Sequence, residues 1–413
     1  MKKQYVFFCL ILATSLLISI QGKAQINETV FHTNYKIDPK KKGNLYIQLD
    51  NLSFFKDNEF DGSTQKGYSL PGLWLKPKLI YYPLKNIKIE AGAYLLKYWG
   101  ANKYPSGMPY AGLPSWNTDQ YQHGFHALPF FRAQIALSKQ VNLVLGDIYG
   151  GADHNLIEPL YNPERNLTAD PEAGLQLLYN SRFVKLDAWV NWESFIFQDS
   201  PHQEAFTFGI SARAKINKPK SKFHIYVPVQ IIMQHKGGEI DTITTSSVQT
   251  WANLAGGLGA TYNINYGVLK RINLELMAAY FSQQAGDKLP FDKGHGFYPK
   301  VTVDVYDFRI KAAYWKCKDF ITLMGNPFFG AVSVSYPGMT FKDPSLFYVG
   351  AEYCRTFGKD FALGIDIDLF AQSGTTAFEP GKSSVKESSA LSFSAGVYFR
   401  MTPSLLLKKF GKE

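Results

Sequence analysis

The stretch VKLDAWVNWESFIF, residues 184–197, alternates apolar and polar side chains. Every second residue from Val184 to Trp192 is apolar. The charged residues Lys185 and Asp187 lie between them, and Glu193 follows Trp192 on the same face as these two charges. A side-chain period of two is that of a β-strand with one apolar and one polar face. Such a strand suits a soluble sandwich, in which the apolar face meets a core. It suits equally a membrane barrel, in which that face meets lipid.

The first 24 residues have the pattern of a secretory signal peptide. Lys2 and Lys3 precede an uncharged apolar run, Tyr5–Ile20, and Gly22-Lys23-Ala24 supplies small residues before the expected cleavage site. The run is shorter than the ~20 apolar residues that a membrane-spanning helix needs. No later segment has such a run, so the mature chain is either soluble and exported or a membrane barrel.

The composition favours the barrel. The 413 residues include 25 Tyr, 31 Phe and 7 Trp, which makes 15% aromatic residues, together with 34 Gly, yet the mean hydropathy is close to neutral. This combination arises when lipid-facing and water-facing positions alternate. The formal charge of +10 comes from scattered basic residues, so no nucleic-acid partner is expected.

Alternating runs of the same kind recur along the chain. They are about 9–12 residues long, the length with which a tilted strand crosses the hydrocarbon layer. The segment 301–314 changes parity near Tyr306, which we interpret as a β-bulge. The sequence predicts about sixteen strands, starting near residues 44, 71, 87, 127, 141, 173, 183, 205, 222, 249, 269, 298, 319, 346, 360 and 390.

Short and long connections alternate between these strands. Short ones include 83–86, 138–140 and 316–318, whereas 99–126 and 150–172 are long and polar. The predicted fold is therefore all-β, a closed antiparallel transmembrane β-barrel of about 16 strands with short periplasmic turns and long extracellular loops. The expected location is the outer membrane of a Gram-negative bacterium. The expected divisions are a signal peptide (1–24), a periplasmic lead-in (25–43), the barrel (44–402) and a short periplasmic tail (403–413). The alternative for the chain end is a final strand that bends at Pro403 and ends at Phe410.

Two sequence segments resemble those of a known group of proteins. GYSLPGLWLKPKLIYYPLKNIKIEAGAYLLKYWGA (67–101) and LIEPLYNPERNLTADPEAGLQLL (156–178) resemble uncharacterised exported members of the porin-like outer-membrane β-barrels of Gram-negative bacteria. The resemblance covers nearly the whole mature chain and is architectural. It implies the barrel fold but assigns no residue a role.

Charged residues fall on the inward face of the predicted strands. One hypothesis is a polar pore with a charged constriction, and the other is a lumen closed by its own ion pairs and by inward-folded loops. The loop 153–172 is the candidate to fold inward. The constriction candidates are Arg132, Lys185, Asp187, Glu193, Arg213, Lys215, Glu275, Asp366 and Asp368.

Two further groups of residues are candidates for binding or cross-linking. Cys317 and Cys354 are a candidate disulfide pair, because both are expected near the periplasmic ends of neighbouring strands. The sequence predicts no metal site and no cofactor. Aromatic residues of the loop 99–126 could stack on a sugar ring or on a partner's surface, and these are Tyr104, Tyr110, Trp116 and Tyr121.

The function predicted from these features is an outer-membrane pore for passive or weakly selective diffusion of small hydrophilic solutes. Its partners would be outer-membrane lipid and those solutes, with a homo-oligomer or an envelope protein as further candidates. The first alternative is a plugged accessory or scaffold barrel that binds an envelope or extracellular partner through its aromatic loops. The second is a hydrolase with its site at the barrel rim. His154, His202 and His235 lie in or near loops, but no motif assigns a nucleophile or base, so the sequence predicts that the protein is not an enzyme.

Overall fold

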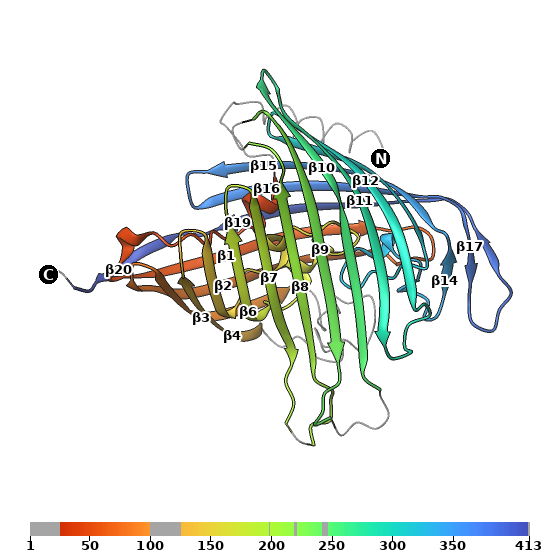
Figure 1. The fold of residues 1–413 in the computed structure, drawn as a ribbon, viewed down its shortest axis with the longest axis horizontal. Helices are drawn as coiled ribbons and strands as arrows, with labels where there is room; N and C mark the ends of the chain where they lie inside the picture. Colours follow the sequence, from red (N-terminus) through yellow and green to blue (C-terminus); the bar gives the residue numbers. More distant parts are fainter. Residues whose placement is uncertain (1–24, 100–124, 198, 219–220, 242–246, 412–413) are drawn as a thin grey trace.

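The computed structural model describes residues 25–99, 125–197, 199–218, 221–241 and 247–411. Within these residues seventeen strands form one antiparallel sheet, sixteen of which pair in chain order and close where β19 meets β1 (Figure 1). The predicted closed 16-strand barrel is confirmed. The barrel strands are β1 (Asn44–Glu59), β2 (Tyr68–Leu84), β3 (Ile87–Tyr98), β4 (His126–Ala136), β5 (Val141–Asp147), β6 (Ala173–Asn180), β7 (Val184–Ser194), β8 (Ala205–Lys215), β9 (Phe223–Lys236), β10 (Gln249–Tyr266), β11 (Leu269–Ala285), β12 (Lys293–Val305), β13 (Phe308–Lys318), β15 (Ser345–Phe357), β16 (Phe361–Gln372) and β19 (Ala390–Met401).

The helical segments are short, and none of those described is long and apolar enough to cross a membrane. A small sheet of three strands lies apart from the barrel at the right of Figure 1. These elements are η1 (Asn27–Phe31), η2 (Pro39–Lys41), η3 (Gly151–His154), α2 (Arg165–Thr168), η4 (Pro327–Phe329), β14 (Thr340–Lys342), β17 (Thr375–Phe378) and β18 (Val385–Glu387).

The two faces of each strand differ as the period of two predicts. On β11, Leu274 and Leu276 are each 41% exposed, whereas the intervening Glu275 is 8% exposed. On β7, Trp192 is 44% exposed and Asp187 only 4%. The apolar side chains therefore form the outer, lipid-facing wall, and the charged ones point into the lumen.

The last strand bends rather than ending in a free periplasmic tail. β19 pairs with β1 only from Asn51 onwards, which leaves the first part of β1 without a partner on that side. After Pro403 the chain continues as β20 (Ser404–Lys409), which pairs with Asn44–Gln48. A sheet edge in lipid would expose unpaired backbone N–H and C=O groups, and β20 covers that edge. The chain after Pro403 thus follows the alternative of a bent final strand rather than the tail expected for 403–413.

The strand predicted near residue 319 is also wrong. The change of parity at Tyr306 is not a bulge but a two-residue turn between β12 and β13, and Tyr306 has a positive φ of 52°. The short turn predicted at 316–318 therefore lies at the extracellular end of β13. The chain from 319 to 344 is a long loop, not a wall strand.

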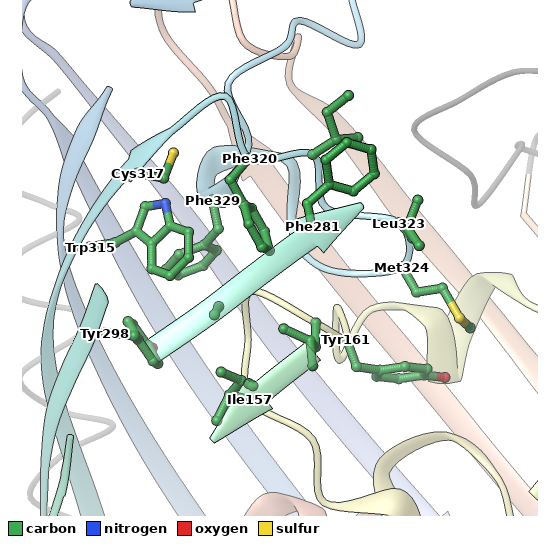
Figure 2. Close-up of a cluster of buried hydrophobic side chains, with 14 of the residues drawn as sticks. Ile157, Tyr161, Phe281, Tyr298, Trp315, Cys317, Phe320, Leu323, Met324 and Phe329 are labelled. Atoms are coloured by element: carbon green, nitrogen blue, oxygen red, sulfur yellow. The ribbon is translucent and has the colours of Figure 1, made fainter. Parts of the chain in front are cut away.

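Two extracellular loops, 148–172 and 319–344, fold into the barrel and fill the extracellular half of its lumen. Ile157 and Tyr161 of the first loop pack with Phe320 and Phe329 of the second (Figure 2). Wall residues surround them, among which Trp315 is 1% exposed. This cluster is a hydrophobic core inside the barrel, and its side chains occupy space that an open pore would need.

The N-terminal segment occupies the lumen as well. Residues 25–43 were predicted to lie in the periplasm, but Ile26, Val30 and Phe31 are buried against the inner wall. The backbone N–H of Ile26 donates to Glu352, and the backbone oxygen of Val30 accepts from Arg400. These contacts hold the segment across the middle of the barrel.

Candidate functional site

The lumen wall between β2 and β4 carries a buried group of charges centred on Glu90. The Glu90 carboxylate lies 3.0 Å from Lys78 Nζ, 3.7 Å from Lys88 Nζ and 3.1 Å from an Arg132 guanidinium nitrogen. All four side chains are at most 5% exposed. Arg132 also donates to the backbone oxygens of Asp147 and Ile148. Arg132, which was predicted to line a constriction, therefore binds the start of an inward loop.

The other predicted constriction residues, on β7, β8, β11 and β16, are mostly paired. Arg213 lies 3.2 Å from Glu275. Asp366 accepts from the hydroxyl of Tyr398, and Asp368 accepts from the hydroxyl of Tyr348 at 2.6 Å. Glu193 accepts from Thr207 at 2.5 Å. The side chains of Lys185 and Lys215 are exposed near the periplasmic turns.

His154 joins the first inward loop to the wall. Its Nδ1 lies 2.8 Å from Asp187, the remaining constriction candidate, and its Nε2 lies 2.7 Å from Glu172. The ring stacks on Trp189 with centroids 3.5 Å apart, and His154 is 1% exposed. Burial by itself would lower the pKa of His154, but the two carboxylates raise it to about 10. His154 is therefore a buried imidazolium that holds the loop.

Trp189 has room to lie against His154 because a glycine faces it on the next strand. Gly209 of β8 is its direct partner in the register. A Cβ at Gly209 would lie 2.1 Å from the indole. A glycine thus allows Trp189 to stack on His154, and no sequence motif indicates this role of Gly209.

Among the cavities lined by described residues, two larger ones lie toward the periplasmic end, on either side of the N-terminal segment. One has a volume of about 540 Å³, and its lining includes Lys78, Lys88 and Arg400. The other has a volume of about 300 Å³, and its lining includes Lys185 and Arg213. Both are vestibules in front of the filled extracellular half.

At the extracellular rim two further histidines each lie beside a polar side chain. His126 faces inward at the start of β4 and lies 2.8 Å from Asp170 of the inward loop. His235 faces the outside of the barrel at the end of β9, and its Nδ1 lies 2.9 Å from Thr250 Oγ1. An imidazole beside a hydroxyl is an arrangement able to activate that hydroxyl as a nucleophile. The spacing of residues in the sequence could not reveal the pair of His235 and Thr250, because the two residues lie on different strands and are brought together by the register of β9 and β10.

The remaining predicted sites have different outcomes. Cys317 and Cys354 are free thiols, so the candidate disulfide is wrong. Cys317 lies at the extracellular end of β13, because the turn falls at 306–307, whereas Cys354 lies toward the periplasmic end of β15. Within the described part of the chain no cluster of three or more ligating side chains could hold a metal. The loop candidates Tyr104, Tyr110, Trp116 and Tyr121, like the signal peptide, lie outside the described residues.

Comparison with protein families gives one match that covers the whole barrel. Residues 37–410 match the family described as lipid A 3'-O-deacylase-type. A search of curated proteins found no match. The family is named for an enzyme, so the prediction that this protein is not an enzyme is wrong.

Among solved structures the chain is similar to outer-membrane barrels. OccK1 (OpdK) of Pseudomonas aeruginosa aligns with a TM-score of 0.50 and 11% identity, over 88% of this chain and 100% of that one. OccAB3 of Acinetobacter baumannii aligns with a TM-score of 0.49 and 11% identity, over 87% of this chain and 99% of that one. At this identity the likeness to OccK1 concerns the fold alone, and it agrees with the predicted porin-like outer-membrane barrel.

Proposed function

The chain belongs to the lipid A 3'-O-deacylase-type family, and on this premise we propose that it is an outer-membrane acyl-ester hydrolase. Its substrate would be a lipid A-type glycolipid of the outer leaflet, from which it would release an ester-linked acyl chain. The observation that carries the proposal is the family match over residues 37–410, since it includes every strand of the barrel.

The interior of the barrel is consistent with this function. A lipid substrate reaches a barrel by lateral diffusion in the membrane and needs no path through the lumen. The inward loops can therefore fill the lumen without blocking the reaction, and the core in Figure 2 would stiffen the wall that carries the site. Ester hydrolysis needs a base and a nucleophile near the ester, which for this lipid lies at the extracellular rim.

The test is the lipid A of a Gram-negative host that expresses the full chain. Mass spectrometry of the extracted lipid A should show a species lighter by one acyl chain, together with the released fatty acid. The control is the same host with an empty vector. Unaltered lipid A, in cells whose outer membrane contains the barrel in its heat-modifiable folded form, would contradict the proposal.

A second candidate function is a gated channel, and the two periplasmic vestibules of about 540 and 300 Å³ favour it. Conduction would require the N-terminal segment and both inward loops to leave the lumen. In a planar bilayer the closed form should give no conductance steps. Reproducible steps from the folded protein would favour the channel, and the lipid A measurement separates the two functions.

A further inference from the structure

A row of four side chains crosses the outer wall one position below the extracellular rim. Trp192 on β7 faces Phe206 on β8, Phe206 faces His235 on β9, and His235 faces Thr250 on β10. The rings of Trp192 and Phe206 are 5.2 Å apart, and those of Phe206 and His235 are 5.0 Å apart. The 44% exposure of Trp192 fixes the row on the lipid side.

The hydrogen bonds of His235 fix which nitrogen can act as a base. Its Nε2 lies 2.7 Å from the backbone oxygen of Gly237, and since a carbonyl only accepts, Nε2 must donate. In the neutral ring Nδ1 then carries no hydrogen and accepts from the hydroxyl of Thr250, 2.9 Å away. Gly237 holds its carbonyl there with a φ of +98°, a conformation that favours glycine.

The other histidines described above have different surroundings. Both ring nitrogens of His154 are bound by carboxylates, and the ring is 1% exposed, so no substrate can approach it. His202 contacts the backbone oxygen of Phe195. His126 faces into the lumen, where its Nε2 lies 2.8 Å from Asp170. In His235 an imidazole with one oriented nitrogen meets a hydroxyl, on the face where lipid lies.

Below the row, toward the middle of the membrane, the outer wall is apolar. The next two rows on the same strands contain no polar side chain, and the register gives them as Val190, Phe208, Met233 and Ala252, then Ala188, Ile210, Ile231 and Leu254. An acyl chain lying along this wall would place its ester near the rim, at the height of His235 and Thr250. An aromatic side chain at that height is typical of the membrane–water interface.

We propose that Thr250 is the nucleophile and His235 the general base for acyl-ester cleavage at this position, an assignment that rests on the proposed function. Thr250 Oγ1 attacks the ester carbonyl carbon while His235 Nδ1 takes its proton. The bond to the sugar oxygen breaks, and that oxygen receives the proton. Water then attacks the acyl-threonine with His235 again as base, which releases the fatty acid and returns the proton to Thr250.

The first test compares variants of the full chain in the lipid A measurement. Thr250→Val and His235→Asn should lower acyl release about 100-fold or more, the contribution of a positioned base or nucleophile. Thr250→Ser should keep most of the activity, because it retains the hydroxyl. Ser282→Ala, which removes a hydroxyl from the outer face of neighbouring β11, and His202→Gln should stay within about twofold of the unaltered protein.

The second test uses a long-chain alkyl fluorophosphonate, which phosphonylates an activated hydroxyl with loss of fluoride. Peptide mass spectrometry should locate the adduct on Thr250, and His235→Asn should abolish it. This readout would not respond to a merely structural role of either residue. It also remains informative if Thr250→Val fails to fold.

The outcomes separate the two proposals. Acyl release that is undiminished in folded Thr250→Val and His235→Asn would overturn the assigned pair and leave the proposed function standing. An adduct at another residue would also overturn the pair. Labelling of Thr250 without any change in lipid A would support the pair and overturn the proposed substrate.

Discussion

His154 and His235 lie on opposite sides of the barrel wall, and their surroundings give one residue type two roles. His154 lies inside, between Asp187 and Glu172, and its ring is stacked on Trp189. His235 lies outside, between a backbone carbonyl and the hydroxyl of Thr250. Two carboxylates favour the imidazolium form of His154, which then binds the inward loop to the wall. A carbonyl and a hydroxyl fix a tautomer instead and leave one nitrogen able to accept a proton.

The same contrast holds for the whole wall. Inward charges such as those around Glu90 are buried in ion pairs, whereas the outward face is apolar down to mid-membrane. Removal of a partner inside should therefore cost much more stability than removal of a polar group outside. Three substitutions test this expectation.

The largest effect is expected for Glu90→Leu. It would leave the cations of Lys78, Lys88 and Arg132 buried without their shared carboxylate, which costs about 3–5 kcal/mol. Urea-driven unfolding in lipid vesicles measures the change. Glu90→Gln, which keeps the size and a hydrogen-bonding oxygen, is the matched control and should fall between Glu90→Leu and the unaltered protein. Equal stability of all three proteins would show that the cluster does not hold the wall.

A smaller and pH-dependent effect is expected at His154. Its pKa is about 6.5 in the unfolded chain and about 10 in the folded protein. Because the folded value is the higher one, the stabilisation is complete below pH ~6.5 and is lost as the pH rises through about 10. Hydrogen exchange of the loop 148–172 should therefore accelerate across that range, beyond its intrinsic pH dependence.

His154→Leu is the control for this pH effect. It leaves Asp187 and Glu172 facing each other without a cation, at a cost on the order of 3 kcal/mol. Its loop should exchange faster than in the unaltered protein at pH 6, and the difference should shrink by pH 10. A constant difference over the whole range would contradict the imidazolium assignment.

The smallest effect on stability is expected for His235→Asn. The substitution removes a partly exposed hydrogen-bonded pair on the outer wall and should cost less than about 1 kcal/mol. A normal heat-modifiable shift on gels, together with lost acyl release, would separate its role from that of His154. Destabilisation as large as that of His154→Leu would instead make His235 a structural residue.

The sequence predicted the wall better than the interior. The period of two assigned Trp192 to the lipid face and Asp187 to the lumen, because each strand is a local pattern with a fixed side-chain period. The period failed at Tyr306, because a two-residue turn and a one-residue bulge both change which alternate residues face inward. The sequence pattern is therefore the same in the two cases. That error displaced one strand and placed Cys317 at the wrong end of the barrel.

The candidate site was much less predictable. His235 and Thr250 are 15 residues apart and meet only because β9 and β10 pair in one particular register. His154 and Asp187 are likewise 33 residues apart and meet because a loop folds inward. A pattern in one segment carries no information about such contacts.

By itself the sequence determined the compartment expected for the protein, the strand period and the barrel, because alternation and turn length are local properties of the chain. Only the tertiary structure decided that two loops fold into the lumen, since that depends on how loops 148–172 and 319–344 pack against each other and against wall residues such as Trp315. It also decided the meaning of VKLDAWVNWESFIF. Its Asp187 binds a histidine rather than a solute, and its Trp192 begins the row that ends at Thr250. Register and packing bring together residues that are distant in the chain, and no local pattern encodes that proximity.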